Sequence, residues 1–244
     1  MISPRRFVRS ATLVLTASLL LSGAASQALA QEKFKFMSGP YAGLPIAFGS
    51  YVGRYTATAQ SRPGSPTIDI YCIDYINDAN FGATWYANIT NLGAGVVLDK
   101  TRRNNGNLAS ALDTYRKAAW LTSHYSTTPM TSAGWGNLQA AVWELFNPGS
   151  PNGGTNASTV GTEAWWLAQV NTFRANTTAW NAYEWGKYSV ITDKNSIGRQ
   201  SGGFQEFVTT AELAPEPATF VMLATGLVIV GAAAARRRKA QQNA

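Results

Sequence analysis

The sequence predicts an α+β domain in which an antiparallel sheet is interrupted by a helical insertion. Three observations lead to this prediction. The first half of the middle region carries β-branched and aromatic residues in short, turn-bounded segments, which is typical of strands. Apolar residues then recur at helical spacing. Strand-like segments return afterwards, and this order of strands, helices and strands favours an α+β fold.

The predicted elements follow one another along the chain with turn signals between them. Strand patterns occupy residues 52–59, 67–73, 84–90, 188–192 and 204–210. Helical patterns occupy residues 108–125, 137–146 and 163–174. The Pro- and Gly-rich residues 62–66 predict a turn, and Asn147-Pro148-Gly149 stops the second helix. A polar loop is expected at 152–159.

Charge and cysteine content exclude several classes of protein. The chain has 244 residues and a net charge of +7, but residues 31–213 hold 13 basic and 12 acidic residues and are almost neutral. A nucleic-acid-binding domain should carry its basic excess in the folded part, so no nucleic-acid partner is expected. Cys72 is the single cysteine and His124 the single histidine, which excludes an intrachain disulfide. One Cys and one His also cannot complete a typical metal site, so we expect neither metal nor cofactor.

Residues 1–30 have the three parts of a secretory signal peptide. Arg5, Arg6 and Arg9 form the positive start, and residues 11–21 are an uncharged apolar run. Ala28-Leu29-Ala30 supplies the small residues of a cleavage site before Gln31. We therefore predict export through the inner membrane and cleavage after Ala30 by signal peptidase.

The C-terminal residues 214–244 also have three parts in order. Pro215-Glu216-Pro217 is an extended tripeptide that no helix can absorb. Residues 218–235 carry no charge, and a helix of this length is barely long enough to cross a bilayer core. A basic cluster, Arg236-Arg237-Arg238-Lys239, follows and is expected to stay cytoplasmic.

This tail resembles the PEP-CTERM sorting signal, which has the same three elements at the chain terminus. The resemblance implies a Gram-negative bacterium that makes exopolysaccharide, and processing near Pro215 to Pro217 by an exosortase-type membrane protease. The tail would anchor the chain transiently, and the mature form would reach the cell surface or the biofilm matrix. The chain then divides into a signal peptide, 1–30, a folded domain, 31–213, and a sorting signal, 214–244.

Two short motifs in the folded domain draw attention to Cys72. Tyr71-Cys72-Ile73-Asp74 ends a predicted strand, and Leu138-Gln139-Ala140-Ala141-Val142-Trp143 opens the second predicted helix. By itself, Cys72 is most simply a small buried apolar residue. Gln139 and Trp143 are four residues apart and therefore share one side of their helix.

Together these motifs resemble the thioester domains of bacterial surface adhesins. The resemblance implies that Cys72 and Gln139 join in an internal thioester with loss of ammonia, although Leu138 stands where that family often has Thr. Gln139 is expected in the first helical turn, where free N–H groups would favour the thiolate and the oxyanion. Trp143 would shield the bond from water, Tyr71 belongs to the strand motif, and Asp74 or Glu144 could move protons. An amine-bearing surface ligand would then be attached covalently and only once, so the protein is not expected to be an enzyme.

Two other functions remain open at this stage. The eight Trp residues could stack on sugars, which predicts a non-covalent structural or exopolysaccharide-binding matrix protein. A minority alternative pairs Cys72 with His124 as a thiol hydrolase.

Overall fold

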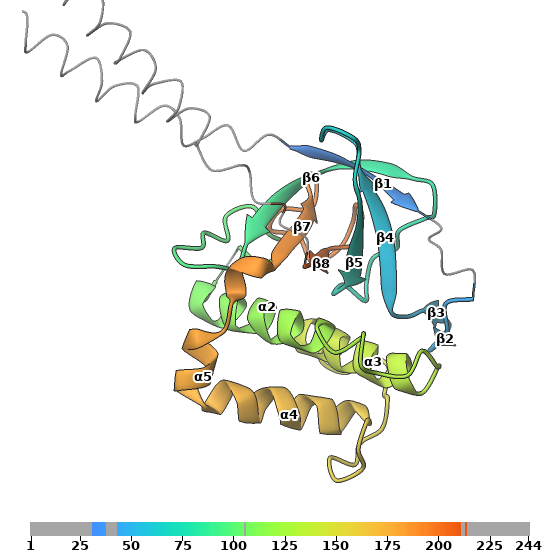
Figure 1. The fold of residues 1–244 in the computed structure, drawn as a ribbon, viewed down its shortest axis with the longest axis vertical. Helices are drawn as coiled ribbons and strands as arrows, with labels where there is room; N and C mark the ends of the chain where they lie inside the picture. The colour runs from blue at the N-terminus through green and yellow to red at the C-terminus, as the bar shows by residue number, and fades with distance from the viewer. Residues whose placement is uncertain (1–30, 38–42, 105, 211–212, 214–244) are drawn as a thin grey trace, which may run out of the picture. The chain divides into compact units, whose positions relative to one another are not determined.

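Six strands close into an antiparallel barrel, in the order β1-β4-β5-β8-β7-β6 (Figure 1). This computed structural model describes residues 31–37, 43–104, 106–210 and 213. The barrel strands are β1 (Glu32–Met37), β4 (Arg54–Ala59), β5 (Thr67–Cys72), β6 (Thr84–Asn91), β7 (Ser189–Asp193) and β8 (Phe207–Thr209). A small hairpin, β2 (Ile46–Ala47) with β3 (Ser50–Tyr51), precedes β4.

The barrel closes because β1 pairs on both of its edges. Phe34 lies opposite Ala59 of β4 and also opposite Trp85 of β6. Aromatic rings fill the interior. The ring centroids of Phe36 and Phe207 are 5.8 Å apart, and Phe34 stacks on Trp85 with centroids 5.5 Å apart. Closure leaves these strands without the exposed edge that an open sheet would present.

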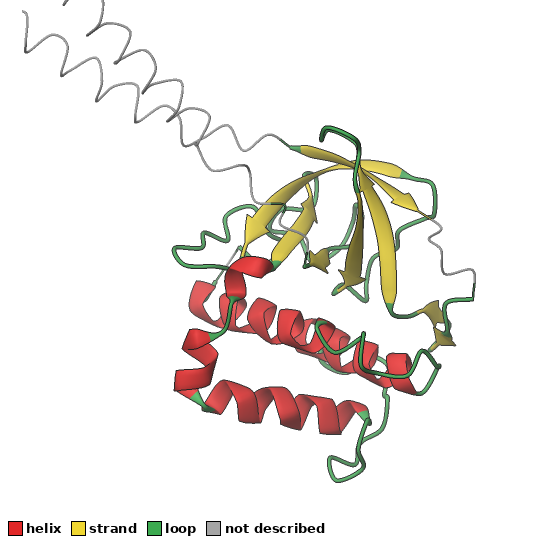
Figure 2. Cartoon of the chain, in the orientation of Figure 1, coloured by secondary structure: helices red, strands yellow, loops and turns green. Residues whose placement is uncertain are grey.

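The helices form layers against one end of the barrel (Figure 2). They are α2 (Leu108–Thr122), α3 (Gly134–Phe146), α4 (Glu163–Ala175) and α5 (Thr177–Ala182), followed by the 3₁₀ turn η2 (Trp185–Lys187). In Figure 1, α2 and α3 lie between the barrel and α4. Because α3 is covered on both sides, most of its residues are buried, including the polar Gln139.

Two glycines allow the β2–β3 region to approach α3 closely. Gly53 has φ +117°, and a Cβ there would lie 2.0 Å from the ring of Trp135. A Cβ on Gly136 would lie 2.8 Å from the Cβ of Ala47. Any larger residue at either position would push the hairpin away from the helix.

The predicted combination of antiparallel sheet and helical insertion is confirmed, while several details differ. The sheet is a closed barrel, and its first strand, β1, was not predicted. The second helix begins at Gly134 instead of 137, and the Gly134 N–H donates to the Thr131 hydroxyl just before the helix. The prediction that Gln139 lies in the first turn is therefore wrong: it lies in the second turn, near the middle of α3.

The predicted signal peptide, 1–30, and sorting signal, 214–244, fall outside the described residues. Ala30, Pro215, Glu216, Pro217 and Arg236 to Arg238 belong to these segments. In the ranges that are described, no helix combines the length and apolar character needed to cross a bilayer.

One arginine connects the two ends of the described domain. The Nε of Arg62 lies 3.0 Å from the Glu32 carboxylate at the start of β1, and its Nη2 donates to the Leu213 carbonyl at 2.7 Å. The Glu32 carboxylate also accepts a hydrogen bond from the Ser61 N–H. The first strand and the last described residue are thus held by the same side chain.

Candidate functional site

Cys72 is the last residue of β5, at the barrel end that faces α3. It is 1% exposed and pairs with Phe207 of β8. Its thiol donates to the Asp74 carbonyl, with sulfur and oxygen 3.1 Å apart. The Asp74 carboxylate accepts from the Ile76 N–H, and this local turn ends the strand immediately after the cysteine.

The Gln139 side chain contacts this residue directly. Its Nε2 donates to the Cys72 carbonyl at 2.7 Å, and its Oε1 accepts from the Tyr125 hydroxyl at 2.7 Å. Gln139 is 0% exposed, so both ends of its carboxamide must be satisfied inside the protein. The two hydrogen bonds fix the carboxamide beside Cys72, although 67 residues separate the two in sequence.

The environment of Cys72 favours the neutral thiol. Burial raises the pKa of Cys72 to about 12, and the nearby charges of Asp74 and Asp78 also raise it. The Trp143 indole N–H opposes this shift because it favours the thiolate. That indole nitrogen is buried and has no hydrogen bond of good geometry with the described atoms. The expected lowering of the pKa by the helix N-terminus is absent here, since the first turn of α3 lies elsewhere.

Aromatic rings enclose the pair. Tyr71 stacks on Tyr125 with centroids 5.2 Å apart, and Tyr125 meets Trp135 edge-on at 5.5 Å. Tyr75 packs on Trp143 with ring centroids 5.0 Å apart. Burial raises the pKa of Tyr125 well above its usual range, and its hydroxyl donates to Gln139.

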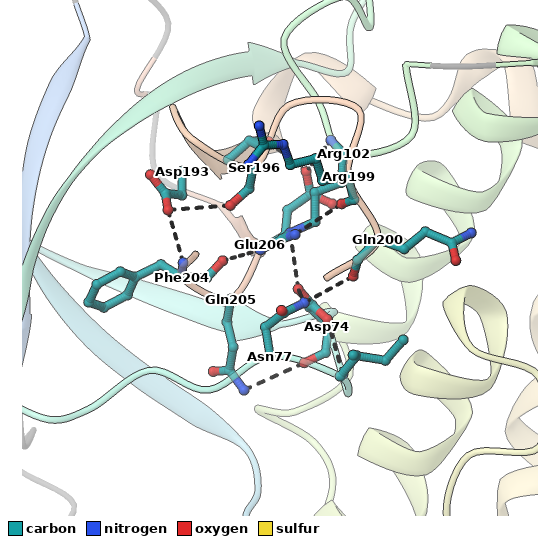
Figure 3. A network of polar contacts seen from close by, with 12 residues as sticks. Asp74, Asn77, Arg102, Asp193, Ser196, Arg199, Gln200, Phe204, Gln205 and Glu206 are labelled. Atoms are coloured by element: carbon teal, nitrogen blue, oxygen red, sulfur yellow. Dashed lines mark hydrogen bonds and ion pairs between the residues drawn. The ribbon is translucent and has the colours of Figure 1, made fainter. Parts of the chain in front are cut away.

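A second polar cluster begins two residues after Cys72 (Figure 3). The Arg102 Nε lies 3.1 Å from the Asp74 carboxylate, and both side chains are buried. Asn77 donates to the same carboxylate at 2.7 Å. Arg102 also donates to three backbone carbonyls, those of Arg199, Gly202 and Phe204. Burial raises the pKa of Asp74, and the positive charge of Arg102 opposes this shift.

Glu206 completes this cluster with a carboxylate that has three donors. They are the backbone N–H of Arg102 at 3.0 Å, the Thr192 hydroxyl at 2.6 Å and the Tyr115 hydroxyl at 2.9 Å. Burial raises the pKa of Glu206 above its ordinary value, while these donors lower it. The cluster fixes the loop before β8 to the end of β5, and it thereby helps to hold Cys72, the last residue of β5, in position.

The residues expected to assist the site separate into two groups. Tyr71 and Trp143 lie beside the Cys72–Gln139 pair. Asp74 contributes its backbone carbonyl to the thiol, while its carboxylate is held by Arg102. Glu144 points elsewhere: its carboxylate accepts from the Gly149 N–H at 2.8 Å, beyond the end of α3.

His124 and the tryptophans have other neighbours. The His124 ring nitrogen lies 2.8 Å from the Trp120 carbonyl, and the ring packs against Trp120 and Trp166. The hydrolase alternative therefore has no hydrogen bond between Cys72 and His124 in the described part of the chain. Six of the eight Trp are buried, and the other two are half-buried. They serve the core, and polysaccharide binding stays a prediction.

Tyr125 is the main site residue that the sequence patterns missed. It is the last residue of the predicted helix 108–125, and it belongs to neither motif. The described residues contain no group of three or more His, Cys, Asp or Glu side chains that could hold a metal ion. Comparison of the chain with models of protein families, with curated proteins and with solved structures gave no match.

Proposed function

We propose that Cys72 and Gln139 form an internal thioester, and that the protein is an exported surface or matrix protein that attaches covalently to amine-bearing partners. One observation carries the proposal: the buried Gln139 carboxamide donates to the Cys72 carbonyl and accepts from Tyr125. Fixed placement of this kind replaces a bimolecular encounter by an intramolecular step, with an effective molarity that can reach about 10⁵ M.

The proposed bond forms by acyl transfer within the domain. The Cys72 sulfur adds to the side-chain carbonyl carbon of Gln139, and negative charge develops on Oε1. The Tyr125 hydroxyl donates to this oxygen and would stabilise the charge. The carbon–nitrogen bond then breaks, the thiol proton leaves with the nitrogen as ammonia, and a carbon–sulfur bond remains.

Burial supports the persistence of the proposed bond. Cys72 and Gln139 are 1% and 0% exposed, so water reaches the acyl carbon poorly. An amine that enters would take the acyl group and release Cys72 as a thiol, whose raised pKa makes the protonated product stable. The reaction occurs once per molecule, so this is a covalent binding module and not a turnover enzyme.

The predicted ends of the chain supply its location in this proposal. Signal peptidase would cleave after Ala30, and an exosortase-type protease would process the tail near Pro215 to Pro217. The domain would then function at the cell surface or in an exopolysaccharide matrix. Mass spectrometry of the chain purified from its own host tests this part through the positions of the two new termini.

Intact mass spectrometry also tests the thioester. The folded wild-type chain should be one ammonia lighter than its sequence. Treatment with methylamine should then increase the mass by one methylamine, added at Gln139. Cys72→Ala and Gln139→Ala should both have full mass and take up no methylamine. A wild-type chain of full mass that takes up no methylamine would contradict the proposal.

A further inference from the structure

A cleft of about 250 Å³ lies beside α3, the helix that carries Gln139. Tyr51 of β3 and the loop residues Asp78, Ala79 and Phe81 contribute to its outer wall. Trp143 and Tyr55 line its inner part and are 2% and 6% exposed. Trp143 lies one helical turn after Gln139 in α3, on the same side of the helix, and Tyr55 lies on β4 beside β5, the strand that ends at Cys72. A molecule in this cleft would therefore contact Trp143 of α3, the helix that also carries Gln139.

Among the described residues that line the cleft, Asp78 is the one with a charged side chain, and its charge is negative. Asp78 is exposed, and its carboxylate has no hydrogen bond or ion pair with the described residues. Burial is the main cause of the raised pKa of Cys72, and the nearby charge of Asp78 adds to it. No Lys or Arg is among the described lining residues. The cleft therefore favours a cation over an anion.

Aromatic rings at the cleft provide a second feature that suits a cation. Tyr51 and Phe81 line it with their rings 5.7 Å apart, and they are 48% and 41% exposed. Tyr75, which packs on Trp143, is 38% exposed. Ring faces attract ammonium groups, and they also contact the alkyl chain that carries the ammonium.

We propose that this cleft binds a primary alkylammonium ion, such as a lysine side chain, and that Asp78 selects it as the nucleophile for the Gln139 acyl group. The inference rests on the thioester of the proposed function. Neutral hydroxyl groups of sugars or of Ser and Thr gain nothing from the Asp78 carboxylate. Asp78 is thus a specificity-determining residue, and the aromatic rings position the alkyl chain.

The transfer balances without any further reactant. The bound ammonium loses one proton to solvent, and the neutral amine adds to the side-chain carbonyl carbon of Gln139. The carbon–sulfur bond breaks, and a second proton moves from the nitrogen to the Cys72 sulfur. The products are a substituted amide at Gln139, a thiol at Cys72 and one proton in solution.

Two amine probes of different charge test the role of Asp78 in the full chain. Pentylamine is an ammonium ion at neutral pH, as a lysine side chain is, while hydroxylamine is neutral. Asp78→Asn should lower the second-order rate constant for pentylamine about tenfold, the effect of losing one charge-assisted contact. The rate constant for hydroxylamine should stay the same, and Asp78→Glu should restore most of the pentylamine rate.

Asp99→Asn is the matched control, because Asp99 is an exposed carboxylate outside the cleft. It removes the same charge and should change neither rate. If Asp78→Asn slows both probes equally, or slows neither, Asp78 does not select the ammonium and the inference is wrong while the thioester stands. If the wild-type chain has full mass and neither probe adds, the thioester itself is wrong and both proposals fall.

Discussion

Two buried polar clusters meet at the end of β5, and they are constructed in different ways. Arg102, Asp74 and Glu206 form a charged cluster in which Arg102 and Glu206 each have several partners. Cys72, Gln139 and Tyr125 form a neutral cluster with few hydrogen bonds, beside an indole N–H that has none of good geometry. The charged cluster holds the backbone in place, and the neutral cluster is the one that supplies the reacting groups in the proposed function.

The largest effect is expected from breaking the charged cluster. Arg102→Ala leaves the Asp74 carboxylate buried without its positively charged partner, and we expect the free energy of unfolding to fall by about 3–5 kcal/mol. Denaturant unfolding measures this change. Arg199→Ala is the control, because Arg199 is exposed and its backbone carbonyl still accepts from Arg102. If the two variants were equally stable, the charged cluster would not be what stabilises this end of the barrel.

The neutral cluster should respond in chemistry more than in stability. Tyr125→Phe removes the donor to Gln139 Oε1, so thioester formation should slow by about 10²–10³-fold. The buried oxygen left without a donor should cost about 1–3 kcal/mol. The time course of ammonia loss after refolding measures the rate, and Tyr75→Phe, on an exposed ring, is the control. An unchanged rate would show that Tyr125 only orients the carboxamide.

Glu206 should contribute a smaller, pH-dependent effect. Its pKa in the folded chain is raised above the ordinary value of 4.5, chiefly by burial. The folded state therefore retains a proton that the unfolded state releases, and this contribution to stability is complete below pH 4.5 and is lost as pH rises through the raised pKa. Unfolding free energies measured across pH should vary less in Glu206→Gln than in the wild type. A steeper dependence in the variant would contradict the direction of the shift.

The smallest effect is expected from Glu144→Gln. The Glu144 carboxylate bonds to Gly149 outside both clusters. Stability should change by less than about 0.5 kcal/mol, and the mass deficit of one ammonia should be unaffected. If a smaller fraction of the variant molecules had lost ammonia, Glu144 would again be an assisting residue, as its position in the sequence suggested.

Local patterns predicted most elements, and long-range pairing set the limits. The strands β4 to β8 and the helices α2 to α4 were predicted because each carries its own local pattern. Strand β1 was missed even though it alternates buried Glu32, Phe34 and Phe36 with half-buried residues. Barrel closure was beyond prediction, because it depends on β1 pairing with β6 and on β7 lying between β6 and β8.

The candidate site shows the same limit. The motifs identified Cys72 and Gln139, which the fold brings into contact. Tyr125 lacks a motif, and its role depends on a hydrogen bond across 14 residues that no periodicity encodes. Arg102 and Glu206 are 104 residues apart and meet only in the folded barrel. Asp78 looks like any loop carboxylate until the cleft around it is known.

Arg62 has a consequence for how this domain opens. Chain ends are normally the first parts of a protein to fray, and each end frays independently. Here the same guanidinium holds Glu32 and Leu213, so release of one end removes a partner from the side chain that secures the other. The two ends of the domain should therefore exchange their amide hydrogens as one unit, and a pulling force on either end would act on both.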